Sequence, residues 1–168
     1  TNAADSKSQA VSLGLNGEYS SKLSGRISLG YSWIDFDSPT LETSDNLVSS
    51  LDLSWNHNSK TSSSYFINRQ FSPSAQGISR FSTSLGVRLN HKLTDRLRGF
   101  ASTNYSLIDS SLNDGSTSSM DQFALGIGID YNWSDFIMVG SIYNFSLIEA
   151  MSENYDRPTF EIYASGRF

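Results

Sequence analysis

The amino-acid sequence predicts an all-β fold, an antiparallel up-and-down transmembrane β-barrel of which about nine strands are visible. Three observations support this prediction. Long stretches alternate between apolar and small polar residues with the period of two that a strand imposes. Short polar turns recur about every 36 to 40 residues, and longer polar connections lie between them. Aromatic residues gather at both ends of the alternating stretches, as they do where a barrel meets two headgroup layers.

The first three strands have the clearest alternation. Over residues 11–19, apolar side chains from Val11 to Tyr19 alternate with Ser, Gly, Asn and Glu. Residues 26–33 repeat the pattern up to Trp33, and residues 47–56 repeat it up to Trp55. Each stretch therefore has one apolar and one polar face.

The remaining six strands follow the same rule with three exceptions. Alternation is weaker in the predicted strands 62–71 and 97–108, and strand 136–148 loses it around Ser141. The regular members are 81–90, 123–133 and 160–168, the last of which ends on Phe168. Helical periodicity does not compete with this pattern anywhere in the chain.

The connections fall into two classes. We predict short periplasmic turns at 20–24, 56–60, 92–96 and 132–135. We predict long extracellular loops at 37–45, 72–79, 109–120 and 149–158, with residues 1–9 as an extracellular loop or tail. This asymmetry of loop length is typical of outer-membrane barrels.

The strands of a soluble β-sandwich also alternate between apolar and polar residues, and a β-solenoid is a further alternative fold. The predicted strands are about 10–13 residues long, which suits tilted membrane strands better than soluble ones. All four lysines are predicted to lie off the strands, at Lys7, Lys22, Lys60 and Lys92. The residues predicted to form the aromatic girdle are Tyr19, Trp33, Trp55, Phe81, Tyr131, Trp133 and Phe168. These features favour the membrane barrel.

Composition excludes several functions. The net charge of −5 provides no basic patch for nucleic acid. The absence of cysteine excludes disulfides and thiolate metal sites. No apolar run approaches the 18 residues of a membrane helix.

The polar faces of the strands hold the candidate site. Strand parity predicts a set of lumen-lining residues: Glu18, Arg26, Asp52, Arg88, Arg98, Asp130, Glu161, Tyr163 and Arg167. In a wide barrel these charges would tune the selectivity of a channel, whereas in a narrow barrel they would pair across a filled core. Tyr163 is the clearest inward aromatic platform for a sugar. The two hypotheses are therefore a channel and a structural barrel that anchors or completes an envelope complex.

No enzymatic, metal or cofactor site is expected. His57 and His91 lie in or next to short turns, where we expect them to bond water. A lipid-cleaving Ser–His pair would be needed at the opposite rim. Carboxylates of the long loops, such as Asp45 and Glu149, are open to two interpretations: solvated groups, or ligands of cations that bridge lipopolysaccharide.

The chain also resembles a known family. Repeated hairpin units read "EYSSKLSGRISLGYSW", "RLNHKLTDRLRGFASTNYSL" and "DYNWSDFIMVGSIYNFSL". These units resemble the C-terminal part of the Putative beta-barrel porin 2 family, over about residues 10–168. The resemblance implies a channel in the bacterial outer membrane, in several members connected with exopolysaccharide export, surrounded by lipids and lipopolysaccharide. A terminal Phe168 is similar to the signal that barrel assembly machinery reads.

Nine strands do not make a complete bacterial barrel, because such barrels usually have an even number of strands. An open edge cannot face lipid, since unpaired backbone groups there cost several kcal/mol each. Three explanations are open: further strands before Thr1, strands from other chains, or a count that is wrong by one. The first predicts that this segment is the C-terminal part of a barrel of ten or more strands.

Overall fold

The structure is a computed structural model that describes residues 6–36, 44–73, 79–111, 117–150 and 153–166. Nine strands form one sheet in this part of the chain: β1 (Ser6–Ser20), β2 (Leu23–Phe36), β3 (Ser44–Asn56), β4 (Thr61–Pro73), β5 (Ser79–Lys92), β6 (Leu97–Ser111), β7 (Thr117–Asn132), β8 (Ile137–Ala150) and β9 (Glu153–Gly166). They are hydrogen-bonded in sequence order, and each pair is antiparallel. The predicted nine-stranded up-and-down fold is confirmed.

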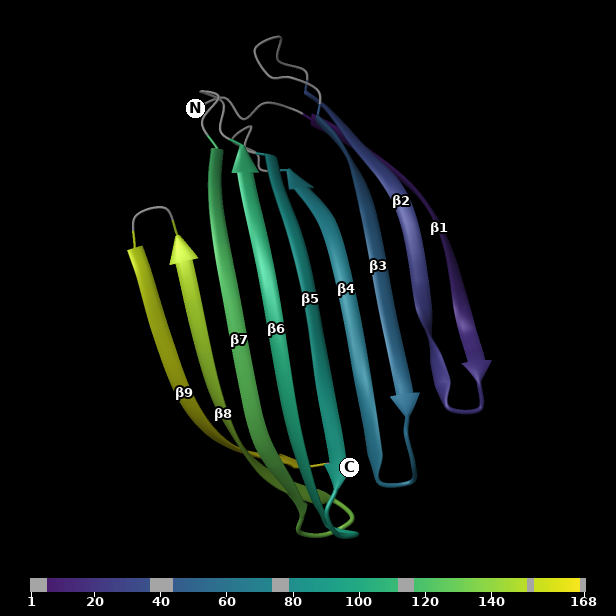
Figure 1. Cartoon of the computed structure of the whole chain (residues 1–168), viewed down its shortest axis with the longest axis vertical. Helices are drawn as coiled ribbons and strands as arrows, with labels where there is room; N and C mark the ends of the chain where they lie inside the picture. The colour runs from purple at the N-terminus through teal and green to yellow at the C-terminus, as the bar shows by residue number, and fades with distance from the viewer. Residues whose placement is uncertain (1–5, 37–43, 74–78, 112–116, 151–152, 167–168) are drawn as a thin grey trace.

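Figure 1 shows these strands side by side in one curved layer, with β1 and β9 at its two edges. The four short turns lie together at one end, which we call the short-turn end; we call the other the long-loop end. Over the described ranges the sheet is open, because β1 and β9 are not paired with each other. No helix among the described residues is long and apolar enough to span a membrane.

Burial in this sheet is the inverse of that in a soluble protein. Leu13 is 84% exposed and Ile162 is 73% exposed. In β7, Ile127 and Ile129 are exposed while the alternating Gly128 is buried. Phe100 is the only large apolar side chain that is fully buried in the described part of the chain. Such an extended apolar surface needs an apolar medium to cover it.

The soluble β-sandwich is therefore excluded. A sandwich buries its apolar faces between two packed sheets. Here all nine strands belong to a single sheet, and the faces made by Leu15, Leu29 and Leu85 remain exposed. Lipid chains provide the missing partner, because a bilayer covers an outward apolar band without a second protein layer.

The four short turns share one local structure. In each turn a side-chain oxygen accepts hydrogen bonds from the backbone N–H groups two and three residues later. The accepting residues are Ser20, Asn58, Thr94 and Ser134, with N···O distances of 2.9–3.3 Å. Ser, Thr and Asn favour turns because their short side chains can replace a backbone partner in this way. This chemistry explains why the turns recur at related positions.

The strands extend beyond the predicted boundaries at the long-loop end. The loop predicted at 149–158 is shorter, because β8 continues to Ala150 and β9 begins at Glu153. The loops predicted at 37–45, 72–79 and 109–120 are likewise shortened by β3, β4, β5, β6 and β7, and β1 begins inside the predicted tail 1–9. The reason is that an antiparallel ladder joins backbone groups and can continue past the apolar stretch into polar sequence. Residues 37–43, 74–78, 112–116 and 151–152 lie outside the described residues.

Candidate functional site

The strand register separates the sheet into two faces. Residues directly opposite each other in neighbouring strands point to the same side of a sheet. Arg26 faces Asp52 in this way, and Arg98 faces Asp130. We call this side the polar face and the other side the apolar face. By this register the polar face carries the following predicted residues: Glu18, Arg26, Asp52, Arg88, Arg98, Asp130, Glu161 and Tyr163. Arg167 lies outside the described residues.

A buried carboxylate organises the polar face at the short-turn end. Asp130 on β7 is 4% exposed. Its Oδ2 accepts from Arg98 Nη2 at 2.7 Å and from Nε at 3.2 Å, and its Oδ1 accepts from the Tyr163 hydroxyl. Arg98 is on the neighbouring strand β6, while Tyr163 is on β9, two strands away. The bond from β9 therefore crosses β8 on the polar face.

Gly140 makes this crossing possible. It lies between Asp130 and Tyr163 in the register, and a Cβ on it would be 2.5 Å from Tyr163 Cζ. The same arrangement occurs twice more: the Phe100 ring covers Gly128, and the Phe66 ring covers Gly86. In each case the aromatic residue is directly opposite a glycine and fills its space.

Sequence analysis missed Phe66 and Phe100 as polar-face residues. Phe66 belongs to β4 and Phe100 belongs to β6, and these are two strands whose alternation is irregular. The glycines directly opposite them on β5 and β7 are the signal that could have found them. The expectation of Tyr163 as an open sugar platform also needs correction, because its ring packs over Gly140 and its hydroxyl bonds Asp130.

Arg88 has a different environment from that of Arg98. Its guanidinium lies over the Phe100 ring, 4.1 Å from the centroid, and its Nε donates to Asn90 Oδ1 at 3.2 Å. The side chain is exposed. Within the described ranges no carboxylate is within ion-pair distance of Arg88. Its charge is therefore held in place without being neutralised.

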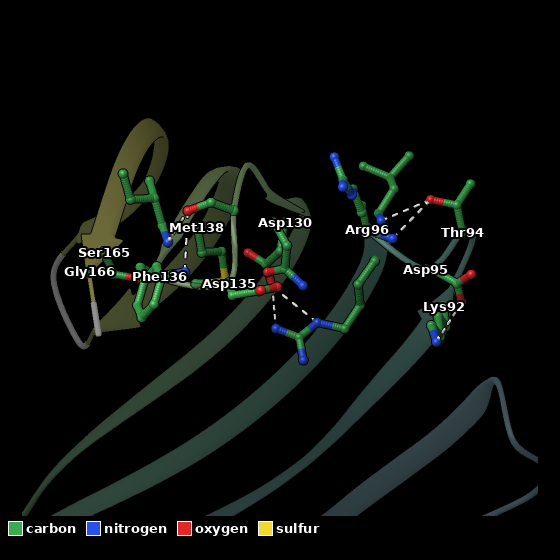
Figure 2. A pocket seen from close by; sticks show the side chains of 15 residues that line it. Lys92, Thr94, Asp95, Arg96, Asp130, Asp135, Phe136, Met138, Ser165 and Gly166 are labelled. Carbon is green, nitrogen blue, oxygen red and sulfur yellow. Dashed lines mark hydrogen bonds and ion pairs between the residues drawn. The ribbon is translucent and has the colours of Figure 1, made fainter. Parts of the chain in front are cut away.

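A cavity of about 610 Å³ opens at the short-turn end of β5 to β9 (Figure 2). Figure 2 shows Asp130 near the middle of the cavity and Lys92 and Asp95 at one side, and Arg98 also lines the cavity. Lys92 Nζ is 2.9 Å from Asp95 Oδ1. The hydrogen bond and the charge of Lys92 hold the pKa of the Asp95 carboxyl below its ordinary value. Two of the cationic side chains that line the cavity, Lys92 and Arg98, are thus paired with carboxylates.

The two histidines bond protein hydroxyls rather than water alone, which corrects the expectation. His57 Nε2 is 2.8 Å from Ser63 Oγ, and His91 Nδ1 is 2.9 Å from Thr61 Oγ1. Ser63 is 2% exposed and also donates to the Tyr65 hydroxyl at 3.1 Å. A buried hydroxyl is not accessible to a substrate. No group of three metal-ligating side chains occurs among the residues that the structure describes.

The apolar face carries the predicted girdle residues at its two ends. Tyr19, Trp55, Tyr131 and Trp133 are exposed near the short turns, with exposed fractions from 40% to 68%. Trp33 and Phe81 are half-buried near the long-loop end, where the Phe81 ring stacks on Phe71 with centroids 4.9 Å apart. Phe168 lies outside the described residues.

Comparison with known proteins agrees with this architecture. A loop-deletion mutant of OmpT, an outer membrane protein of Vibrio cholerae, superposes on the chain with a TM-score of 0.58 at 13% sequence identity. The match covers 94% of this chain and 54% of that one, so the chain spans about half the length of that protein. The similarity shows a shared fold. No protein with a curated description matches the sequence. The sequence matches the Putative beta-barrel porin 2 family over residues 1–167. The chain therefore belongs to the Putative beta-barrel porin 2 family and has the fold of a β-barrel protein of the bacterial outer membrane.

Proposed function

We propose that the chain contributes nine strands to a porin-like channel whose polar face lines a water-filled path for small hydrophilic solutes. The observation that supports this proposal most is the unpaired charge of the polar face. Arg26, Asp52 and Arg88 lie there without an ion pair in the described part of the chain, and burial of unpaired charge in a filled core is costly. Water in a lumen solvates such groups.

Diffusion of small solutes is favoured over export of a polysaccharide. Sugar rings are usually held by exposed aromatic platforms. On the described polar face, Phe66, Phe100 and Tyr163 pack over glycines, whereas Tyr155, near the long-loop end, is 52% exposed. The remaining surface is rich in serine, and some of its hydroxyls bond each other, as in the Ser28–Ser50 pair at 2.7 Å. Such a lining solvates small solutes without binding them tightly.

A second candidate is a structural barrel without transport. The contacts around Asp130 favour it, because they fill part of the short-turn end with an ion pair and an aromatic ring. We infer that neither form is an enzyme and that neither needs a cofactor. Contacts with lipopolysaccharide and recognition of Phe168 by the assembly machinery stay predictions.

Conductance separates the two candidates. The full-length protein, purified in detergent, is inserted into a planar bilayer in 1 M KCl. We expect stable steps of current that are proportional to voltage. A protein that is folded by its heat-modifiable gel mobility and yet gives no current would reject the channel and favour the structural barrel.

A further inference from the structure

The polar face of the three central strands has an uneven charge. By the register, β4, β5 and β6 present Arg80, Arg88, Lys92 and Arg98 on this face. No Asp or Glu alternates with them on the same face of these strands within the described ranges. The carboxylates of the polar face belong instead to the flanking strands, with Asp52 on β3 and Asp130 on β7.

Two of these four cations are neutralised. Asp130 binds Arg98 through two nitrogens, and Asp95 binds Lys92 at 2.9 Å. A third, Arg80, lies near the long-loop end, eight residues along β5 from Arg88 or about 27 Å at the rise of a strand. Of these four cations, Arg88 is the one near the short-turn end that is exposed and has no carboxylate at ion-pair distance in the described part of the chain.

The geometry of Arg88 suits anion recognition. The Phe100 ring supports one face of the guanidinium, and Asn90 accepts the Nε hydrogen. The two Nη groups remain to donate to an oxyanion. A guanidinium presents such donors in a planar fork that matches carboxylate and phosphate oxygens. Its orientation is set in advance, so less side-chain freedom is lost when an anion binds.

We propose that Arg88 is an anion-selecting site of the channel, and that Asp130 is a positioning residue that neutralises Arg98. The ligands are small solutes with a carboxylate or phosphate group. This inference rests on the proposed channel and deepens it by naming a solute class and the group that selects it. Arg98 then contributes mainly to structure, since its charge is balanced and its guanidinium is tied to β7.

The test is the anion-to-cation permeability ratio of the full-length protein, taken from the reversal potential across a gradient of KCl. Arg88→Gln should lower the ratio about threefold at 0.1 M salt, since a unit charge several Å from a permeating ion acts with about that strength in water. Arg88→Lys should retain most of the ratio. Lys7→Gln is the control: Lys7 is an exposed cation on the apolar side of β1, and its loss should leave the ratio unchanged.

Two further measurements examine the neutralised arginine and the ligand. Asp130→Asn keeps an acceptor for Tyr163 but no longer neutralises the charge of Arg98, so the anion-to-cation permeability ratio should rise.

Inorganic phosphate, added at millimolar concentration, should reduce the KCl current of the wild type, and Arg88→Gln should weaken this block several-fold. A weaker block with Lys7→Gln as well would indicate a general loss of charge and overturn the assignment to Arg88.

The outcomes distinguish this inference from the proposed function. Absence of current in every folded variant would reject the channel, and with it any selectivity. If the wild type conducts and the permeability ratio is the same for Arg88→Gln as for Lys7→Gln, the channel is retained and the inference is overturned. Should Asp130→Asn fail to fold, the comparison of Arg88→Gln with Arg88→Lys still decides the role of Arg88.

Discussion

At the scale of single residues, Asp130 shows how a charge can be held inside a barrel wall. It is 4% exposed, and both of its oxygens have partners. Burying a carboxylate is costly unless it is paired and hydrogen-bonded. Arg98 supplies the charge and Tyr163 supplies a further donor, which together join β6, β7 and β9.

Removal of this carboxylate should destabilise the protein. Asp130→Ala leaves Arg98 and Tyr163 without their acceptor, and we expect the free energy of unfolding to fall by about 1–3 kcal/mol. The expected loss is smaller than for a fully buried ion pair, because the Arg98 side chain is 52% exposed and can form hydrogen bonds with water. The measurement is urea unfolding of the protein in liposomes. Asp95→Ala is the control, because it breaks an ion pair on the exposed turn and should change little. Equal effects of the two substitutions would contradict the role of burial.

The glycine under Tyr163 gives a second prediction. Gly140→Ala should lower stability by about 1–3 kcal/mol, because the new Cβ overlaps the aromatic ring. Gly99→Ala is the matched control, since the nearest atom to its Cβ would be Leu93 Cδ1 at 3.6 Å, an ordinary contact. Both are measured as shifts in melting temperature in detergent. Adding Tyr163→Ser to Gly140→Ala should remove the overlap penalty, and failure to do so would disprove this explanation.

At the scale of the strand, alternation decides which residues meet lipid. Leu85 is 47% exposed and Ile127 is 56% exposed, both on the apolar face. The neighbouring Ser84 and Gly126 are on the polar face, where Ser84 Oγ lies 2.9 Å from Ser106 Oγ. One step along the strand therefore changes the environment from lipid to a polar, partly filled interior.

Charge placed on the two faces should have unequal effects. Leu85→Arg or Ile127→Arg should lower the stability of the folded protein in the bilayer by about 2–4 kcal/mol when the site is near the bilayer midplane. Ser54→Arg should be tolerated better, because Ser54 is exposed on the polar face of β3. Gly126→Arg is a poor comparison, since even a Cβ there would be 2.9 Å from Asn144 Oδ1 and Ser102 Oγ. The measurement is folding yield in liposomes, and equal yields for Ile127→Arg and Ser54→Arg would contradict the assignment of faces.

At the scale of the whole molecule, the protein is a curved sheet with an aromatic band at each end of its apolar face. Trp33 is near the long-loop end, while Trp55 and Trp133 are near the short-turn end. Indole rings prefer the headgroup level of a bilayer because they are apolar with one polar group. The distance between the two bands should therefore match the thickness of the membrane.

Lipid quenching can test this arrangement. Variants of the full-length protein that keep one of the three tryptophans are folded into bilayers of brominated lipids. Bromine near the headgroup should quench Trp33, Trp55 and Trp133 more strongly than bromine near the chain ends. Addition of a soluble quencher on the outside should affect Trp33 differently from the other two, since they lie at opposite ends. Strongest quenching at the bilayer centre would contradict the two bands.

Much of this architecture could be predicted from local sequence. Residues 123–133 show it best, because each apolar residue there is exposed and each alternating Gly or Asp is enclosed. The turn positions were also recognisable, since Asn58 and Thr94 have side chains that favour turns. The irregular strands β4 and β6 were harder, because Phe66 and Phe100 interrupt the polar face.

The amino-acid sequence by itself determined the class of the fold, the number of strands and the face on which charges such as Arg26, Asp52 and Asp130 lie. These properties depend on the period of two and on chemistry within a few neighbouring residues. Only the tertiary structure decided which side chains meet. Asp130 binds Arg98 and Tyr163 because the register aligns residues that are 32 and 33 positions apart, and because Gly140 leaves room for the ring. Partnership across strands depends on register and curvature, which the alternation of a single strand does not encode.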